Sequence, residues 1–173
     1  MQAARGPYPA SPIKLVGLRP EVLSELARQL PGVTWLVEAD GAKGLLLKAP
    51  AEYEPVVPGD ANRVVIVAGL EAIDQPLDGR VVHRPEIAAR LLRVPLGEIL
   101  TPNLLANLVG HPSGGLKGIP SQAKVIALLT QRDGRSHIHA DTIARQLQSN
   151  HRISRVVSVD LRVPDPVLEI WDG

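Results

Sequence analysis

The sequence predicts an α/β fold with a mainly parallel sheet and helices on both faces. Four apolar runs lack the alternation of half-exposed strands, and segments with helical spacing separate most of them. Buried strands that alternate with helices are typical of parallel sheets. The expected strands are residues 33–39, 63–68, 124–130 and 155–159.

The first part of the chain is expected to hold an arm, a helix and two strands. Residues 1–11 are rich in Ala, Gly and Pro and predict a flexible arm, and a short apolar run at 13–16 is a further possible strand. Pro20 opens a segment with apolar residues at helical spacing, which Pro31-Gly32 ends. The strands at 33–39 and 63–68 follow.

The second part predicts three helices among the remaining strands. Residues 85–92 form the first, and Thr101 is a good N-cap before Pro102 for a helix that reaches about Val109. Residues 140–147 form the third. At 173 residues the chain has room for one such domain, which we expect over 12–173.

Composition excludes several classes of function. The 19 Lys and Arg against 18 Asp and Glu leave a net charge of +1, too balanced for a nucleic-acid-binding surface. The absence of cysteine excludes disulfides and thiolate metal sites, and we expect no zinc, iron–sulfur or haem cofactor. No run approaches a membrane span and no export signal precedes the first helix. We therefore expect a cytoplasmic protein without a membrane or nucleic-acid partner.

Two acids stand where the run at 33–39 ends, on the side where parallel sheets bind their ligands. Glu38 and Asp40 are two residues apart, so on extended backbone they project to one side and form a candidate Mg²⁺ site. Gly41 and Gly44 flank Lys43 and permit close backbone approach. The alternative is a strand end that carries solvated acids.

Basic residues in Gly- and Pro-bearing loops form a second candidate group. Lys43, Lys48, Arg84 and Lys117 together predict a cleft for an anionic ligand, although each alone would be read as a solvated loop charge. His83 could exchange protons or donate to phosphate, or lie on the surface in a first helical turn.

Other polar residues have simpler interpretations. Glu52 and Glu54 lie in a Pro-rich loop and could equally face solvent. His137, His139 and Asp141 invite a metal site, but they stand at a helix entrance, where polar residues act as caps.

The stretch 35–58, WLVEADGAKGLLLKAPAEYEPVVP, resembles the YqeC family, described as accessory proteins of selenium-dependent molybdenum hydroxylases. The family pattern is an apolar strand, EADGAKG, LKAP and an EP element, with Tyr53 here where His is common. Shorter matches extend the resemblance: VGL at 16–18, VAGL at 67–70, HRPE at 83–86, GGLKGIP at 114–120 and LLTQRD at 128–133.

The resemblance implies a fold similar to P-loop nucleotide-binding proteins and a nucleotide with Mg²⁺. EADG stands in the place of the Walker B acid, and LLTQRD resembles the NKxD corner that recognises the base. Thr130 and Asp133 match that corner, whereas Gln131 replaces its Lys, so a preference for guanine is not implied.

The Walker A loop of the family has no counterpart in this sequence. No G-x-x-x-x-G-K-[ST] occurs, and the nearest segment, GHPSGGLK at 110–117, has Leu116 where Lys is required. The chain thus resembles the carboxyl-terminal two thirds of the family, as a shortened gene model, a split gene or a natural loss would produce. Phosphoryl transfer then lacks its main source of charge stabilisation.

Three functions follow from these expectations. The first, which the resemblance implies, is an accessory protein for maturation of selenium-dependent molybdenum hydroxylases, with an incomplete nucleotide site. The second is a Mg²⁺-dependent nucleotide or phosphate-ester hydrolase that a separate or upstream segment completes. The third is a non-catalytic binding or scaffold module. The expected partners are a maturing hydroxylase or cofactor-handling proteins, and self-association is possible because apolar strand edges and faces would be exposed.

Overall fold

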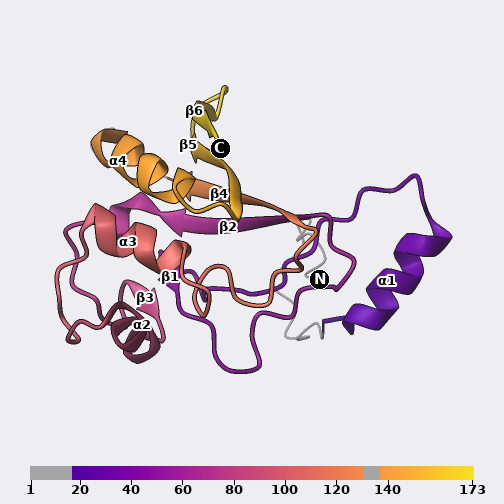
Figure 1. Cartoon of the computed structure of the whole chain (residues 1–173), viewed down its shortest axis with the longest axis horizontal. Helices are drawn as coiled ribbons and strands as arrows, with labels where there is room; N and C mark the ends of the chain where they lie inside the picture. Colours follow the sequence, from indigo (N-terminus) through magenta and orange to yellow (C-terminus); the bar gives the residue numbers. More distant parts are fainter. Residues whose placement is uncertain (1–16, 131–136) are drawn as a thin grey trace, which may run out of the picture.

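A computed structural model describes residues 17–130 and 137–173 (Figure 1). The predicted arm at 1–11, the run at 13–16, and Gln131 to Asp133 lie outside the described residues. Over the described part the chain is a mixed α/β structure with parallel strands. None of the described helices is both long and apolar enough to cross a membrane.

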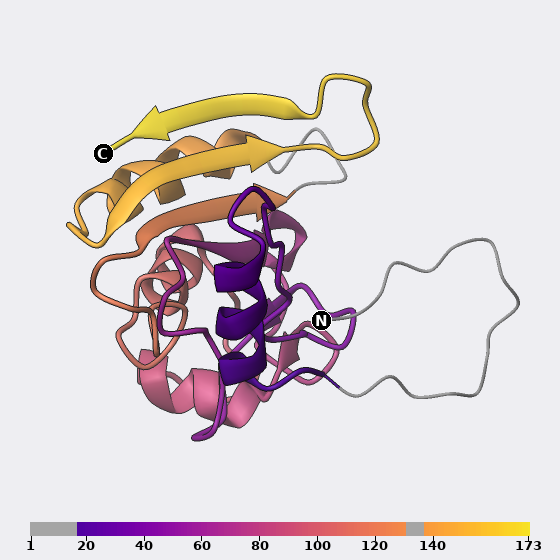
Figure 2. The same ribbon diagram turned by 90° about the vertical axis from the view of Figure 1, so that its right-hand side faces the viewer.

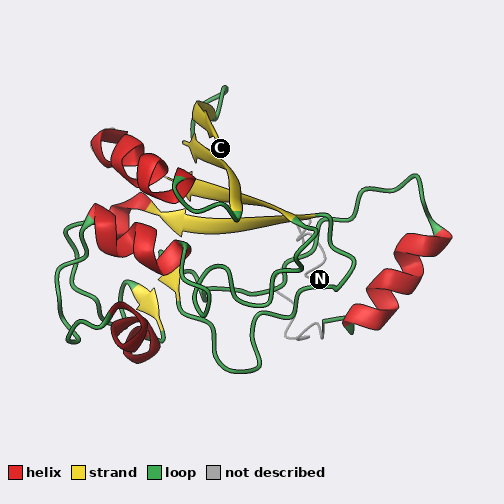
Figure 3. Cartoon of the chain, viewed as in Figure 1, coloured by secondary structure: helices red, strands yellow, loops and turns green. Residues whose placement is uncertain are grey.

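Figure 1 labels the elements along the chain, and Figure 3 colours the helices red and the strands yellow. They are α1 (Pro20–Gln29), β1 (Leu47–Lys48), β2 (Arg63–Gly69), the 3-10 turn η1 (Leu70–Ala72), β3 (Val82–His83), α2 (Pro85–Leu92), α3 (Pro102–Val109), β4 (Lys124–Thr130), α4 (His137–Gln148), β5 (Ile153–Val159) and β6 (Val167–Asp172).

The main sheet has four strands in the order β2-β4-β5-β6. The first three are parallel, which confirms the predicted strands at 63–68, 124–130 and 155–159, and β6 runs antiparallel to β5. The two-stranded parallel sheet of β1 and β3 joins it where the Gly69 amide donates to the Leu46 carbonyl at 3.0 Å. A Cβ at Gly69 would lie 2.9 Å from Leu46 Cδ2, so glycine permits this approach.

The predicted strand at 33–39 is wrong, because this segment is irregular. One edge of β2 pairs with β4, and at the end of the other edge the Gly69 amide bonds to the Leu46 carbonyl. The run at 33–39 pairs with no described strand, and Leu36 is 91% exposed. Conversely, β6 follows a Pro-rich turn and was not expected from the sequence.

The helices α3 and α4 pack against each other and against one face of the main sheet. Figure 1 shows both beside the sheet, with α2 next to α3. Their shared core includes Leu105, Ile143 and Leu129, each fully buried. On the opposite face Val65 and Val67 are 50% and 59% exposed, so the expectation of helices on both faces is wrong for the described residues.

Candidate functional site

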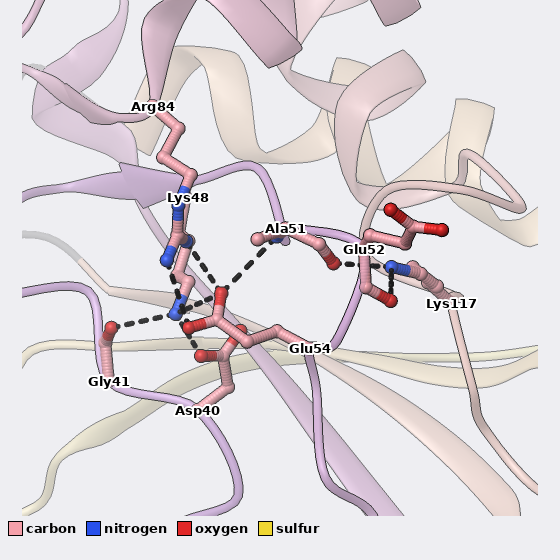
Figure 4. A network of polar contacts seen from close by, with 8 residues as sticks. All are labelled: Asp40, Gly41, Lys48, Ala51, Glu52, Glu54, Arg84 and Lys117. Carbon is pink, nitrogen blue, oxygen red and sulfur yellow. Dashed lines mark hydrogen bonds and ion pairs between the residues drawn. The ribbon is translucent and has the colours of Figure 1, made fainter.

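A network of ion pairs lies at the carboxyl ends of β1 and β3 (Figure 4). Because these strands are parallel and pair Lys48 with His83, they deliver their following residues to the same side. Arg84 comes next and is the N-cap of α2, with a left-handed backbone at φ 63°. The two short strands thus bring Lys48 and Arg84, which are far apart in the sequence, to one carboxylate.

Glu54 is the centre of the network. Its carboxylate accepts two hydrogen bonds from the Arg84 guanidinium, at 2.5 and 2.9 Å, and lies 3.1 Å from Lys48 Nζ. The Ala51 amide donates to the same carboxylate at 3.2 Å. A bidentate Arg–carboxylate pair fixes both planes, so Glu54 has one defined position.

Asp40 closes the network on the other side of Lys48. Its carboxylate forms an ion pair with Lys48 Nζ, which also donates to the Gly41 carbonyl at 3.0 Å. The Lys48 side chain is only 10% exposed and that of Asp40 20%. Asp40 and Glu54 therefore hold one ammonium between them, and the sequence-predicted residues Asp40, Lys48 and Arg84 do lie together.

Glu54 is ionised over the whole physiological range. Burial by itself would raise its pKa, but hydrogen bonds from Arg84, Lys48 and the Ala51 amide outweigh burial and lower the pKa to about 2. The network thus contains fixed charges of both signs rather than a proton donor.

His83 and Lys43 border the network. The pKa of His83 is lowered by burial and by the positive charges of Arg84, Lys43 and Lys48, against a smaller opposing effect of Glu54. The imidazole is therefore neutral at neutral pH and can accept a proton or a hydrogen bond. Lys43 is exposed, has φ at 55°, and lies near enough to His83 for its charge to help lower the pKa of that imidazole.

Lys117 holds the loop that carries Glu54. Its ammonium donates to the main-chain carbonyls of Ala51 and Glu52, the latter at 2.9 Å. Gly114 and Gly115 place this loop, since a Cβ at either would lie within 3 Å of a carbonyl oxygen at the end of α3. The GGLK segment is thus a packed turn, and in this structure Lys117 ties two loops together.

The remaining predicted residues are not joined to this network by any described contact. Glu38 is exposed, and its predicted partner Asp40 is engaged by Lys48. Thr130 ends β4 beside Gly69, and Asp133 lies outside the described residues. Strand 33–39 does not exist, so the expected delivery of Glu38 and Asp40 from a strand end is also wrong.

The candidate metal ligands in the described part of the chain are not clustered. No group of three or more His, Asp or Glu residues there is arranged to hold a metal ion. Asp141, from the His-rich entrance of α4, instead accepts hydrogen bonds from Arg145 at 2.8 Å and from the Trp171 indole at 3.3 Å. Glu71, in the turn after β2, has a buried Oε1 that meets no hydrogen-bond donor within the described ranges.

Glu54 was missed as a site residue because its loop looked solvated. The signal was present in the sequence, since AEYEP places a carboxylate shortly after the Lys of LKAP. Two cations that are both partly buried need an anionic partner. Matching each buried cation of the motifs with an acid in a neighbouring motif would therefore have identified Glu54.

Comparisons with known proteins match the part of the chain that contains the network. Residues 3–86 match the family described as YqeC protein. A protein of Escherichia coli (strain K12) named "Uncharacterized protein YqeC" is 33% identical over 107 residues, which is 62% of this chain and 42% of that protein. No solved structure matches.

The four ion-paired residues Asp40, Lys48, Glu54 and Arg84 all fall within the matched segment. Over residues 3–86 this chain is similar to the YqeC family, which confirms the resemblance that its EADGAKG, LKAP and HRPE motifs indicated.

Proposed function

We propose that this chain is an accessory protein in the maturation of selenium-dependent molybdenum hydroxylases, acting in the cytoplasm, and that it binds a phosphate-bearing ligand beside the ion-pair network. The accessory role comes from the family resemblance. The observation that carries the ligand site is the network itself. It joins one residue from each of four motifs that carry the resemblance: Asp40, Lys48, Glu54 and Arg84.

The charge arrangement supports an anionic ligand. Asp40 and Glu54 hold Lys48 and Arg84 in place, whereas the Lys43 ammonium is exposed and has no ion-pair partner among the residues that the structure describes. Because the pKa of His83 is lowered, its neutral imidazole can form a hydrogen bond with the ligand without first losing a proton. Since Asp40 and Glu54 already neutralise Lys48 and Arg84, Lys43 is the cation that would pair with the phosphate, and Lys48 and Arg84 could only donate further hydrogen bonds to it.

The nucleotide site remains incomplete in this proposal. No Walker A sequence cradles the β- and γ-phosphates, so we expect Mg²⁺ complexes of ATP and GTP to bind weakly. If Mg²⁺ accompanies the ligand, Glu38 and Asp40 are the proposed oxygens, and Asp40 would have to share its carboxylate with Lys48. Titration calorimetry tests this directly, and sub-micromolar affinity for either nucleotide would contradict an incomplete site.

A hydrolase is the second candidate, favoured by the lowered pKa of His83 beside three cations. A neutral imidazole in such a place can take a proton from an attacking water. The hydrolase would still need another segment to cradle the phosphates.

Complementation separates the proposed role from a purely structural one. A strain that lacks the gene is supplied with the wild type, Asp40→Asn or the control Asp60→Asn, and hydroxylase activity is measured at equal chain abundance. We expect Asp40→Asn to lose most of the activity and the control to retain it. Full activity of a folded Asp40→Asn chain would overturn the site.

A further inference from the structure

The main sheet has an apolar surface on the side away from α3 and α4. Side chains alternate between the two faces along each strand, so this side collects residues that the core does not use. Val67 is 59% and Ile170 50% exposed. Strand register places Val67, Leu128, Val157 and Ile170 in one row across the sheet. We call this row, with its neighbours Val65 and Ile126, the open face.

The open face ends in a basic group at the amino ends of the strands. Arg63, Lys124 and Arg155 come from three adjacent parallel strands and line a hollow together with Ile126 and Ser154. Figure 2 shows β4, β5 and β6 side by side, with α4 behind them. The surface is thus apolar in the middle and positive at one end.

This positive charge is only partly balanced. Arg155 Nε donates to Asp172 at 2.6 Å, but Arg63 and Lys124 stand opposite each other without an ion-pair partner among the described residues. Like charges at directly opposite cross-strand positions are destabilising. An anionic group from outside would relieve that repulsion.

A second copy of this chain is a poor occupant. If two open faces packed with their strands in the same direction, the basic groups would meet each other. If the strands ran in opposite directions, each basic group would meet the far end of the other face, where Gly69, Thr130, Val159 and Val167 carry no acid. In the first arrangement the acid that a second copy brings to the basic group, Asp172, is already ion-paired with its own Arg155, and in the second arrangement there is no acid at all.

The geometry points to a partner protein that covers the open face with an amphipathic helix. Parallel sheets in α/β proteins are covered by helices, and here one face has its helices while no helix of residues 17–130 or 137–173 lies over the exposed valines of the other. The helix runs along β2 and β4 with its apolar stripe on Val65 and Val67, and Asp or Glu residues at one end reach Arg63 and Lys124. This inference does not depend on the phosphate site.

Site-specific photo-crosslinking in the native cell tests it. A photoreactive amino acid replaces Val67 on the open face or, as a control, Leu161, which is 74% exposed outside the strands. We expect Val67 alone to crosslink to another protein through a segment with apolar residues at helical spacing and acids at one end. The recovered segment is then synthesised and its affinity for the full chain measured.

Exchange of the charges between the chain and the peptide tests whether Arg63 and Lys124 contact the acids of the helix. The double variant Arg63→Glu and Lys124→Glu should weaken peptide binding at least tenfold with an unchanged melting temperature, and a peptide with Lys in place of its acids should recover it. Four results would overturn the proposal: no adduct specific to Val67, an adduct with a second copy of the chain, a segment without acids, or binding that ignores the charge exchange.

Discussion

The helix-covered core and the ion-pair network are stabilised by opposite kinds of interaction. The core around Leu129 and Ile143 consists of apolar side chains with no exposure, so its stability comes from burial and close packing. The network around Glu54 contains charged groups that are 10 to 22% exposed, and it fixes positions rather than burying area. We therefore expect substitutions in the core to reduce mainly stability and substitutions in the network to reduce mainly function.

Truncation in the core should have the largest effect on stability. Leu129→Ala should lower the free energy of unfolding by about 3 kcal/mol, because the site is fully buried and leaves a cavity. Leu36→Ala is the control in the irregular segment, where we expect less than about 0.5 kcal/mol since that side chain is 91% exposed. Urea denaturation measures both, and equal losses would mean that residues 33–39 are packed as a strand after all.

The contrast between Leu129 and Leu36 also shows what the sequence can predict. Both lie in short apolar runs, but only the run at 124–130 is paired, with β2 on one side and β5 on the other. The strands β2, β4 and β5 were predictable because apolar runs alternate with well-capped helices such as α3, whose Thr101 accepts a hydrogen bond from the Leu104 amide. Whether an apolar run pairs with another strand is decided only when the sheet assembles. The wrong prediction of a strand at 33–39 could therefore not be avoided from the sequence.

The candidate site was predictable in part for a similar reason. Asp40, Lys48 and Arg84 stand in distinctive motifs, and all three enter the network. Glu54 enters because parallel pairing of β1 with β3 brings Arg84 to a loop 30 residues earlier in the chain. Lys117 was predicted to bind ligand, but its contacts with two main-chain carbonyls are a feature of folded packing.

Acid should weaken the network before it affects the core. The pKa of Glu54 is about 2 in the folded chain against an ordinary 4.5, so its stabilising effect is complete above pH 4.5 and is lost as the pH falls towards 2. Because water partly screens these charges, we expect a contribution of about 1–2 kcal/mol at neutral pH.

Glu54→Gln tests this contribution, with Glu52→Gln as the exposed neighbouring control. Unfolding is measured from pH 7 to pH 3. The Glu54 variant should be less stable at neutral pH, and its difference from the wild type should shrink on acidification. A difference that stays constant with pH would mean that the network does not lower the pKa of Glu54.

Removal of the Lys117 ammonium should have a smaller effect. Lys117→Met keeps the alkyl chain but leaves the Ala51 and Glu52 carbonyls without this donor, which should cost about 1 kcal/mol. Hydrogen exchange of the Ala51 and Glu54 amides should accelerate while that of β4 stays unchanged. Unaltered exchange in the loop would show that Lys117 does not hold it.

The most direct test of the account compares two exposed cations that share the same backbone conformation. Lys43 has φ 55° beside the network, and Arg93 has φ 58° at the end of α2, so replacement by Ala has the same conformational consequence at both positions. Each variant should change stability by less than about 1 kcal/mol. Hydroxylase activity is then measured in the complemented strain. The account predicts that Lys43→Ala abolishes maturation while Arg93→Ala supports it fully; full activity of Lys43→Ala, or equal losses in both variants, would contradict a ligand site at the network.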